Sequence, residues 1–456
     1  APGFFLLTSL ARRSWSLSEL LLSSFIISTA FLAPIGVLLS AILKTEPYTT
    51  QVALYTLVFT SCVAYSKHFG LSKVKLHATS TQMAVALLLL IGYPLVIYFG
   101  DHIPRLLTMD ETSYTYLAGR LVYRGEAYGV ISTPGLSDAI SLIKGRYLWT
   151  ALLASFITLT GYPPYKGYLI STMFLPMMAL ASLLLTDKIG GDKWTKIIVF
   201  TLTLFNPSII TFSLFALNDL FVSLMILFAI ICFINAIICF INCIEKNQLE
   251  TKMLLLSLLI FATILFVKEN IVPLIPIYII SIINMIRWRL YRVNRTLKIL
   301  AIIMIVVPLI YELVLDIPHS IALWFLKNEK LVTFTRKFLP YSFLGYILGI
   351  FLPIGTNLKT IMSYKPVDYM GIFYYVFQPE LFNLPISGLI FAIPLLLFCR
   401  KIRMNTRLFL LMIIAEVTAL MYYLHALATG FWWDIPRLSI YLYPLFSSIL
   451  FKIIQD

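Results

Sequence analysis

Residues 86–100, ALLLLIGYPLVIYFG, form an apolar run typical of a membrane span, and the chain soon afterwards reads MDETSYTYLAGRLVYRGEAYG at 109–129. Runs of roughly 17 to 25 apolar residues, the length that a helix needs to cross a bilayer, recur along the whole chain. Of its 456 residues, 60% are hydrophobic and only 12% are charged, whereas a water-soluble domain carries about a quarter charged residues. The sequence therefore predicts an all-α fold, a polytopic bundle of transmembrane helices.

Basic residues predict how these helices are oriented, because Lys and Arg concentrate in cytoplasmic loops. We expect Arg12 and Arg13 on the cytoplasmic side, together with the most basic loops, 66–77, 287–298 and 399–407. The net charge of +14 is explained by such loops and does not indicate nucleic-acid binding. We expect about twelve spans, in a range of roughly 10–14. They are predicted near 18–43, 50–66, 82–100, 168–186, 196–217, 219–243, 252–267, 271–286, 299–315, 385–399, 408–424 and 438–453.

One apolar segment is predicted not to cross the membrane. The span near 82–100 ends on the exterior and the span near 168–186 begins there, so 101–167 forms a long exterior loop. Within this loop, YLWTALLASFITL at 147–159 is too short to cross and is typical of an interfacial helix or a re-entrant segment. A second exterior region is expected at 316–384, with interfacial helices or a tight membrane hairpin.

Charged residues near membrane depth gather at the exterior ends of the predicted spans. Asp110 and Glu111 open the first exterior loop, Asp219 begins a span, and Lys268 lies in an exterior hairpin. A charge at the centre of a membrane helix costs about 2.5–3.5 kcal/mol, so charges near that depth usually line a cavity or mark a functional site. One exterior-facing site is therefore predicted. Three further polar residues near the C-terminus are expected on the same side: His425, Asp434 and Arg437.

Carboxylates beside basic residues at a lipid interface suit the transfer of a sugar. A carboxylate can take the proton from an acceptor hydroxyl as that oxygen attacks a sugar carbon. A lysine or arginine can stabilise the phosphate that leaves. Since nucleotide sugars are not expected outside the cytoplasm, the donor would be a lipid-linked sugar that reaches the site through the bilayer.

The order of these features is similar to that in the GT-C class of glycosyltransferases that use polyprenyl-phosphate sugars, such as protein O-mannosyltransferases and aminoarabinose transferases. The resemblance covers roughly residues 100–300, and its order is more specific than any single motif. The matching stretches are MDETSYTYLAGRLVYRGEAYG (109–129), RYLWTALLASFITLTGYPP (146–164), LLLTDKIGGDKW (183–194), FNPSIITFSLFALND (205–219), LLIFATILFVKENIVPLIP (258–276) and, with Leu in place of the usual Tyr after Pro-Arg, IPRLSIYLYP (435–444).

This resemblance implies a role for each matching residue. Asp110 would be the general base on the acceptor, Glu111 would orient the acceptor or support a metal, and Asp219 would be a second acid in the cavity. Direct attack would invert the anomeric centre. A divalent cation, Mg²⁺ or Mn²⁺, held by these three acids is left open, because some members of the class need one and others do not. Lys268 would bind the donor phosphate, with weaker candidates in Lys144, Arg146 and Arg437.

The same resemblance implies partners, location and organisation. The donor would be a polyprenyl-phosphate sugar, and the acceptor a hydroxyl or amine of a lipid, glycan or protein. The site would face the non-cytoplasmic side of a plasma membrane or endomembrane, among membrane lipids. The chain would comprise N-terminal transmembrane helices (1–81), a GT-C-like catalytic module (82–315), the second exterior region (316–384) and C-terminal transmembrane helices (385–456).

Other interpretations of the same residues stay open. Asp110 and Glu111 suit the start of a helix over the residues that follow them, and Asp219 suits the start of its own span, because acids stabilise helix N-termini. Lys268 suits a turn whose side chain reaches water. A transporter or lipid flippase would also place charges inside a bundle, although it usually has internal repeats and charges near mid-bilayer. A non-catalytic subunit of a cell-envelope assembly is the remaining alternative.

Overall fold

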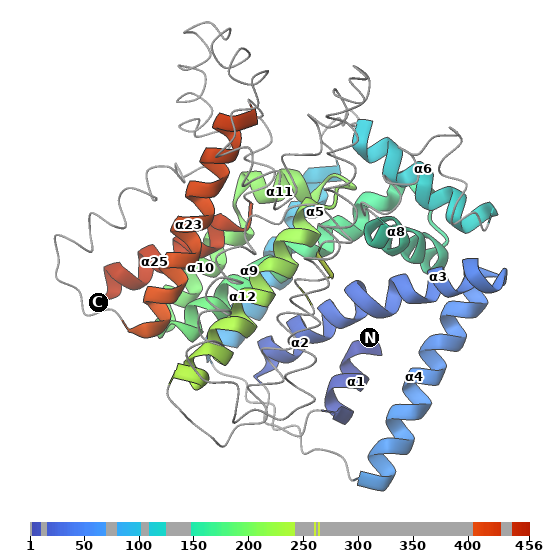
Figure 1. Cartoon of the computed structure of the whole chain (residues 1–456), viewed down its shortest axis with the longest axis horizontal. Helices are drawn as coiled ribbons and strands as arrows, with labels where there is room; N and C mark the ends of the chain where they lie inside the picture. Colours follow the sequence, from blue (N-terminus) through green and yellow to red (C-terminus); the bar gives the residue numbers. More distant parts are fainter. Residues whose placement is uncertain are drawn as a thin grey trace, which may run out of the picture. The chain divides into compact units, whose positions relative to one another are not determined.

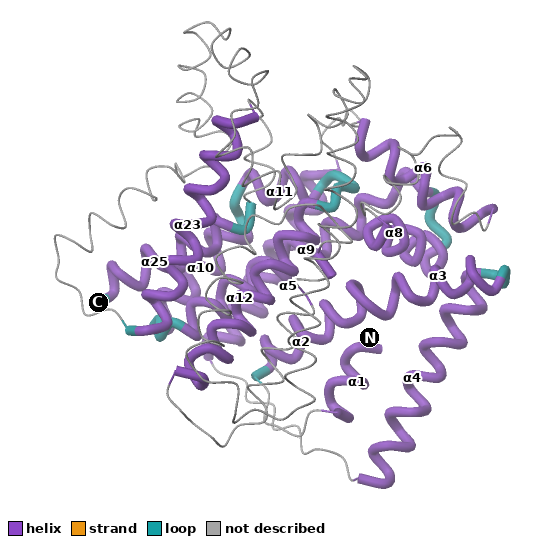
Figure 2. The backbone as a smooth tube through the Cα atoms, viewed as in Figure 1, coloured by secondary structure: helices purple, strands orange, loops and turns teal. Residues whose placement is uncertain are grey.

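The computed structural model describes residues 2–10, 16–69, 80–101, 109–124, 147–241, 260, 263–264, 405–429 and 440–456. Among these residues every regular element is a helix and no β-strand forms (Figures 1 and 2), which confirms the all-α prediction for the described part of the chain. The helices are α1 (Pro2–Leu10), α2 (Leu17–Ile26), the π-helix η1 (Ile27–Leu32), α3 (Ala33–Leu43), α4 (Pro47–Phe69), α5 (Ser80–Asp101), α6 (Met109–Arg124), α8 (Tyr147–Thr160), the 3₁₀ helix η2 (Pro164–Gly167), α9 (Tyr168–Lys188), α10 (Lys193–Leu204), α11 (Pro207–Ser213), α12 (Asp219–Ile241), α23 (Thr406–Thr429) and α25 (Leu442–Gln455).

Two stretches of the described chain are helical, long and apolar enough to cross a membrane, Leu17–Ser40 and Pro164–Lys188. A third is added if the bent pair α10 and α11 counts as one span. These stretches coincide with the spans predicted near 18–43, 168–186 and 196–217. The spans predicted near 271–286, 299–315 and 385–399 lie outside the described residues, and only 260 and 263–264 of the span predicted near 252–267 are described.

The predicted span near 196–217 is not one straight helix. It bends by 51° between α10 and α11. Asn206 causes the break, because its side chain accepts a hydrogen bond from Ile209 N at 3.1 Å and so caps a new helix. Pro207 follows at the first position of α11, where its missing N–H is tolerated. The Asn-Pro pair therefore ends one helix and begins the next.

The chain divides into two units: Ala1–Leu184 with Asp192–Leu224, and Leu185–Gly191 with Met225–Asp456. In the first unit, Gln51 of α4 is fully buried and links three helices. Its amide nitrogen donates to the carbonyl oxygen of Ala33 at 3.2 Å and to the hydroxyl of Ser155 on α8. A Cβ on Gly36 would lie 2.7 Å from Gln51 Cγ. Glycine at this position therefore allows α3 and α4 to approach closely.

Helix α8 confirms the prediction of a separate short helix at 147–159. It has 14 residues and packs against α3 and α6 (Figure 1), so that Trp149 and the stretch 151–154 are buried. Its position in the membrane interface stays a prediction. The ring of Trp149 lies 5.7 Å from that of Phe221 on α12 and 6.0 Å from that of Phe174 on α9, measured between centroids. These contacts make α8 the centre of an aromatic core.

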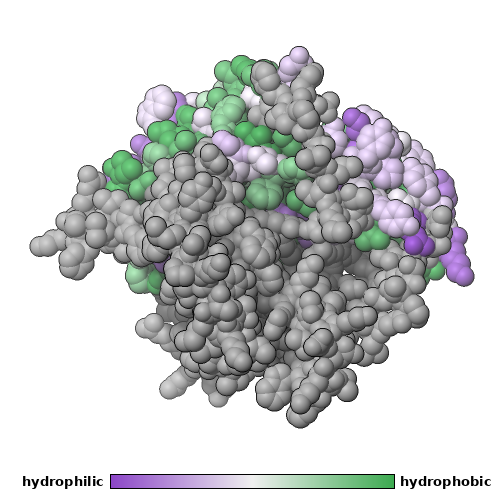
Figure 3. Space-filling model, turned by 90° about the horizontal axis from the view of Figure 1, so that it is seen from above, coloured by the Kyte–Doolittle hydropathy of each residue, from purple (hydrophilic) through white to green (hydrophobic). Residues whose placement is uncertain are grey.

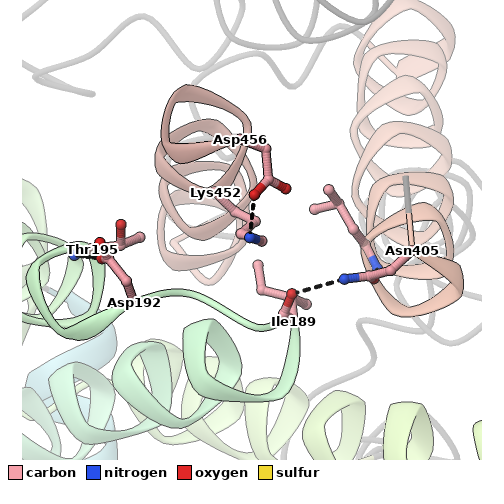
Figure 4. A network of polar contacts seen from close by, with 7 residues as sticks. Ile189, Asp192, Thr195, Asn405, Lys452 and Asp456 are labelled. Carbon is pink, nitrogen blue, oxygen red and sulfur yellow. Dashed lines mark hydrogen bonds and ion pairs between the residues drawn. The ribbon is translucent and has the colours of Figure 1, made fainter. Parts of the chain in front are cut away.

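In the second unit, side chains near the start of α23 hold the turn that follows α9 (Figure 4). Asn405 donates to the carbonyl oxygen of Ile189 at 3.1 Å, and Arg407 donates to that of Lys188 at 3.0 Å. Gly190 has a φ of +86°, a conformation in which glycine is favoured. From α25, Ser448 accepts a hydrogen bond from Thr186 at 3.0 Å. The turn is thus joined to two helices that are more than two hundred residues away in sequence.

Candidate functional site

Helix α6 carries the two acids that open the predicted exterior loop. Asp110 and Glu111 are the second and third residues of α6, in its first turn. This confirms the prediction that a helix begins at these acids. A carboxyl group in this position is stabilised by the unpaired N–H groups and the dipole of the helix N-terminus. Helix capping does not account for the contacts of Glu111, because its side chain also reaches another part of the first unit.

Glu111 is fully buried and contacts the connection between α11 and α12. Its Oε1 atom accepts a hydrogen bond from the backbone N–H of Ala216 at 2.9 Å. The indole N–H of Trp149 donates to the carbonyl oxygen of the same residue at 3.3 Å. Both backbone polar groups of Ala216 are thus bound by side chains, one from α6 and one from α8. We call this arrangement the Ala216 clamp.

A clamp is needed here because the backbone of 214–218 is not helical. Ala216 is fully buried, and a buried peptide group without a hydrogen bond costs roughly 1–3 kcal/mol. Because Ala216 lies outside a regular helix, the acid and the indole satisfy its two backbone groups. The clamp therefore fixes the path of the chain just before α12 begins.

Asp219 is the first residue of α12 and only 2% exposed. It follows Ala216 by three residues, so the clamp brings Asp219 into the same region as the first turn of α6. Asn218, also buried, lies between them, and its carbonyl oxygen accepts from Val222 N at 2.9 Å as the helix starts. The hydrogen bond between Glu111 and Ala216 therefore links the first turn of α6 to the segment just before Asp219, 105 residues further along the chain.

The structure gives less information on the other predicted site residues. His425 belongs to α23. No group of three or more His, Cys, Asp or Glu side chains that could hold a metal occurs within the described ranges. Of the three acids predicted to hold a divalent cation, Glu111 already accepts a hydrogen bond from Ala216 N at its Oε1 atom. Five predicted residues lie outside the described residues: Lys144, Arg146, Lys268, Asp434 and Arg437.

Sequence reasoning missed Trp149 and Glu416. Trp149 was read only as a residue of an apolar helix. Its indole N–H could have indicated a polar contact, because a buried Trp usually needs a hydrogen-bond acceptor. Glu416 is a single acid within the apolar helix α23, and such residues usually mark function. Its Oε1 atom is buried and has no hydrogen-bond partner among the described residues.

No protein-family model matches the chain, and neither a curated protein nor a solved structure matches it. The assignment of function therefore depends on the residues themselves.

Proposed function

We propose that the chain is an integral membrane glycosyltransferase of GT-C type that moves a sugar from a polyprenyl phosphate to an acceptor hydroxyl or amine on the exterior face. The observation that carries the proposal is the Ala216 clamp. It joins the start of the predicted exterior loop to the segment that leads into Asp219. The GT-C resemblance implies that acids from these two segments lie in one cavity.

The contacts also support the proposed sidedness of a bundle of about twelve spans. The charge rule predicts Glu111 and Ala216 on the exterior, and these two residues share a hydrogen bond. The same rule predicts Lys188 and Arg407 in the cytoplasm, and these two residues share another. Each pair comes from segments that are far apart in the sequence. Pairs predicted on opposite sides would have counted against the orientation.

In the proposed reaction, Asp110 takes the proton of the acceptor hydroxyl as the oxygen attacks the anomeric carbon of the sugar. The bond from that carbon to the phosphate oxygen breaks, and its electron pair leaves with the polyprenyl phosphate. Lys268, with Lys144, Arg146 or Arg437, would stabilise the phosphate. Direct attack from the opposite face inverts the anomeric centre. A divalent cation, Mg²⁺ or Mn²⁺, would assist by stabilising the same phosphate charge.

The clamp suggests a more specific role for Glu111 than contact with the acceptor. Because its carboxyl binds the backbone of Ala216, Glu111 would position the chain before Asp219 and leave Asp110 to act as base. Glu111 is then a positioning residue. Asp219 at the start of α12 would face the same cavity and help to bind the acceptor or the cation.

The test is sugar transfer by the purified chain in liposomes supplied with polyprenyl-phosphate sugars. We expect Asp110→Asn to lower the rate by about 10²- to 10⁴-fold, the usual contribution of a general base. Asp187→Asn is the matched control, because Asp187 is an exposed acid in the last turn of α9 and should leave the rate unchanged. Full transfer by a folded Asp110→Asn protein would show that Asp110 is not the base. No transfer by the wild-type protein would contradict the proposal and favour a transporter or lipid flippase.

A further inference from the structure

The exposed side of α6 has an unusual composition for a helix of a membrane protein. Among the described side chains of α6, the exposed large ones are tyrosines, Tyr116 at 59% and Tyr123 at 67% exposure. They are seven residues apart, so they lie on one side of the helix two turns apart. Arg120 lies between them, with its guanidinium carbon 5.9 Å from the centroid of the Tyr116 ring. A polar, aromatic and cationic side of α6 results.

The connection between α8 and α9 extends this surface. Pro164 packs on α6, since a Cβ on Gly119 would lie 3.0 Å from the Cγ atom of Pro164. Gly119 is three residues after Tyr116 and four before Tyr123, so the connection crosses α6 between the two rings. Two more exposed tyrosines flank this crossing, Tyr162 at 46% and Tyr165 at 60%.

We call these four side chains, with Arg120 and Lys166, the tyrosine surface. Lys166 is half-buried and donates to the hydroxyl of Tyr168 at 3.3 Å. Figure 3 shows weakly and strongly hydrophilic side chains at the right of the view, the side on which Figure 1 draws α6 together with α3 and α4. The surface combines flat rings, hydroxyl groups and two cations.

A lipid-facing helix looks different in the same unit. The exposed side of α5 is mostly aliphatic over several turns, with Met83, Leu87, Leu90, Ile91 and Leu95, and it carries one exposed tyrosine, Tyr98. Acyl chains suit such a surface, whereas the side chains of α6 that the structure describes include no exposed large aliphatic residue. Tyrosine rings provide rigid contact area that is apolar on its faces and polar at its hydroxyl. A sugar ring has the same dual character, with an apolar C–H face and hydroxyl groups at its edge.

We propose that the tyrosine surface binds an oligosaccharide. An extended glycan on this surface would stack on the rings, with its hydroxyl and acidic groups near Arg120 and Lys166.

The experiment measures binding of fluorescently labelled oligosaccharides, two to six hexoses long, neutral or containing uronic acids, to the full chain in lipid nanodiscs. We expect affinity to rise with length, and Tyr116→Ala with Tyr123→Ala to weaken binding of the longer members by about ten-fold or more, given the usual strength of aromatic contacts. The paired substitutions to Phe should retain most binding. Tyr48→Ala, at an exposed tyrosine of α4, is the control and should change nothing.

Three outcomes would overturn the inference. One is that no oligosaccharide of the set binds to the wild-type protein, and another is that the paired Ala variant binds as well as wild type. The third is that a photoactivatable lipid cross-links to Tyr116 or Tyr123, which would identify the surface as an interfacial aromatic belt. Length-dependent binding without any sugar transfer would instead retain the glycan surface and reject the transferase.

Discussion

Two connections between helices are each bound by side chains from distant parts of the chain. In one connection these side chains are buried, and in the other they are exposed or half-buried. The connection at 214–218 lies in the interior of the first unit and is bound by Glu111 and Trp149, which are both fully buried. The turn at 188–191 belongs to the second unit and is bound by Asn405, which is exposed, and Arg407, which is half-buried. A carboxylate and an indole form hydrogen bonds to the first connection, whereas a guanidinium and an amide form hydrogen bonds to the second.

This difference predicts which connection loses more free energy of unfolding when one of its side chains is substituted. Where water reaches a backbone carbonyl, it can replace a lost side-chain donor at little cost. Where water does not reach, the backbone group keeps the full penalty of an unmade hydrogen bond. A buried carboxyl group also needs a specific reason to be there. In the first connection, the carboxyl group accepts a hydrogen bond from the backbone of Ala216, three residues before Asp219.

The largest effect is expected from Glu111→Leu. This substitution removes the acceptor of the buried Ala216 N–H and should lower the free energy of unfolding by roughly 1–3 kcal/mol. Sugar transfer should fall further than stability explains, because the chain before Asp219 loses its anchor. Thermal unfolding in detergent and transfer rates below the transition measure the two effects.

Glu111→Gln is the control for this substitution, because its amide oxygen can still accept from Ala216 N. It should retain most of the stability and most of the transfer activity. Equal losses in the Gln and Leu variants would mean that the carboxyl group acts on substrate or metal and that the clamp is secondary.

A smaller effect is expected from Trp149→Phe. The ring contacts with Phe174 and Phe221 are largely kept, whereas the indole donor to the Ala216 carbonyl is lost. We expect a loss of about 0.5–1.5 kcal/mol in the free energy of unfolding. Trp194→Phe is the control, because Trp194 on α10 is strongly exposed. Comparable losses in both variants would show that the hydrogen bond to Ala216 contributes little.

The smallest effect is expected from Arg407→Ala. Because Arg407 is half-buried and its bond to the Lys188 carbonyl is only partly shielded, water should replace the guanidinium. The free energy of unfolding should change by about 0.5 kcal/mol or less. Chemical denaturation of the purified protein would measure this. A loss as large as that of Glu111→Leu would remove the contrast between the two connections.

The sequence was informative wherever local chemistry decides the structure. Acids after an apolar run predicted the start of α6, and a run too short to cross predicted α8. Asn206 and Pro207 carried a local signal for the bend between α10 and α11, although the hydrophobic pattern alone suggested one continuous span. In each case the decisive groups are neighbours in the chain.

The clamp itself could not be predicted in this way. Glu111 and Ala216 are separated by 105 residues, and the partner of the acid is a backbone group that every residue carries. Nothing in the side chain of an alanine marks it as the partner. Trp149 likewise looked like any apolar residue of its helix. Sequence order could suggest that acids converge on one site, but only the packing of α6 and α8 shows what Glu111 binds.

The most direct test of the proposed transferase is to identify the lipids that co-purify with the protein by mass spectrometry, for the wild type and for Lys268→Ala. We predict a polyprenyl phosphate or its glycosylated form bound to the wild type, and its loss from the variant while other lipids remain. If other lipids are detected but no polyprenyl species binds, even after one is added, the account of a polyprenyl-phosphate donor is wrong.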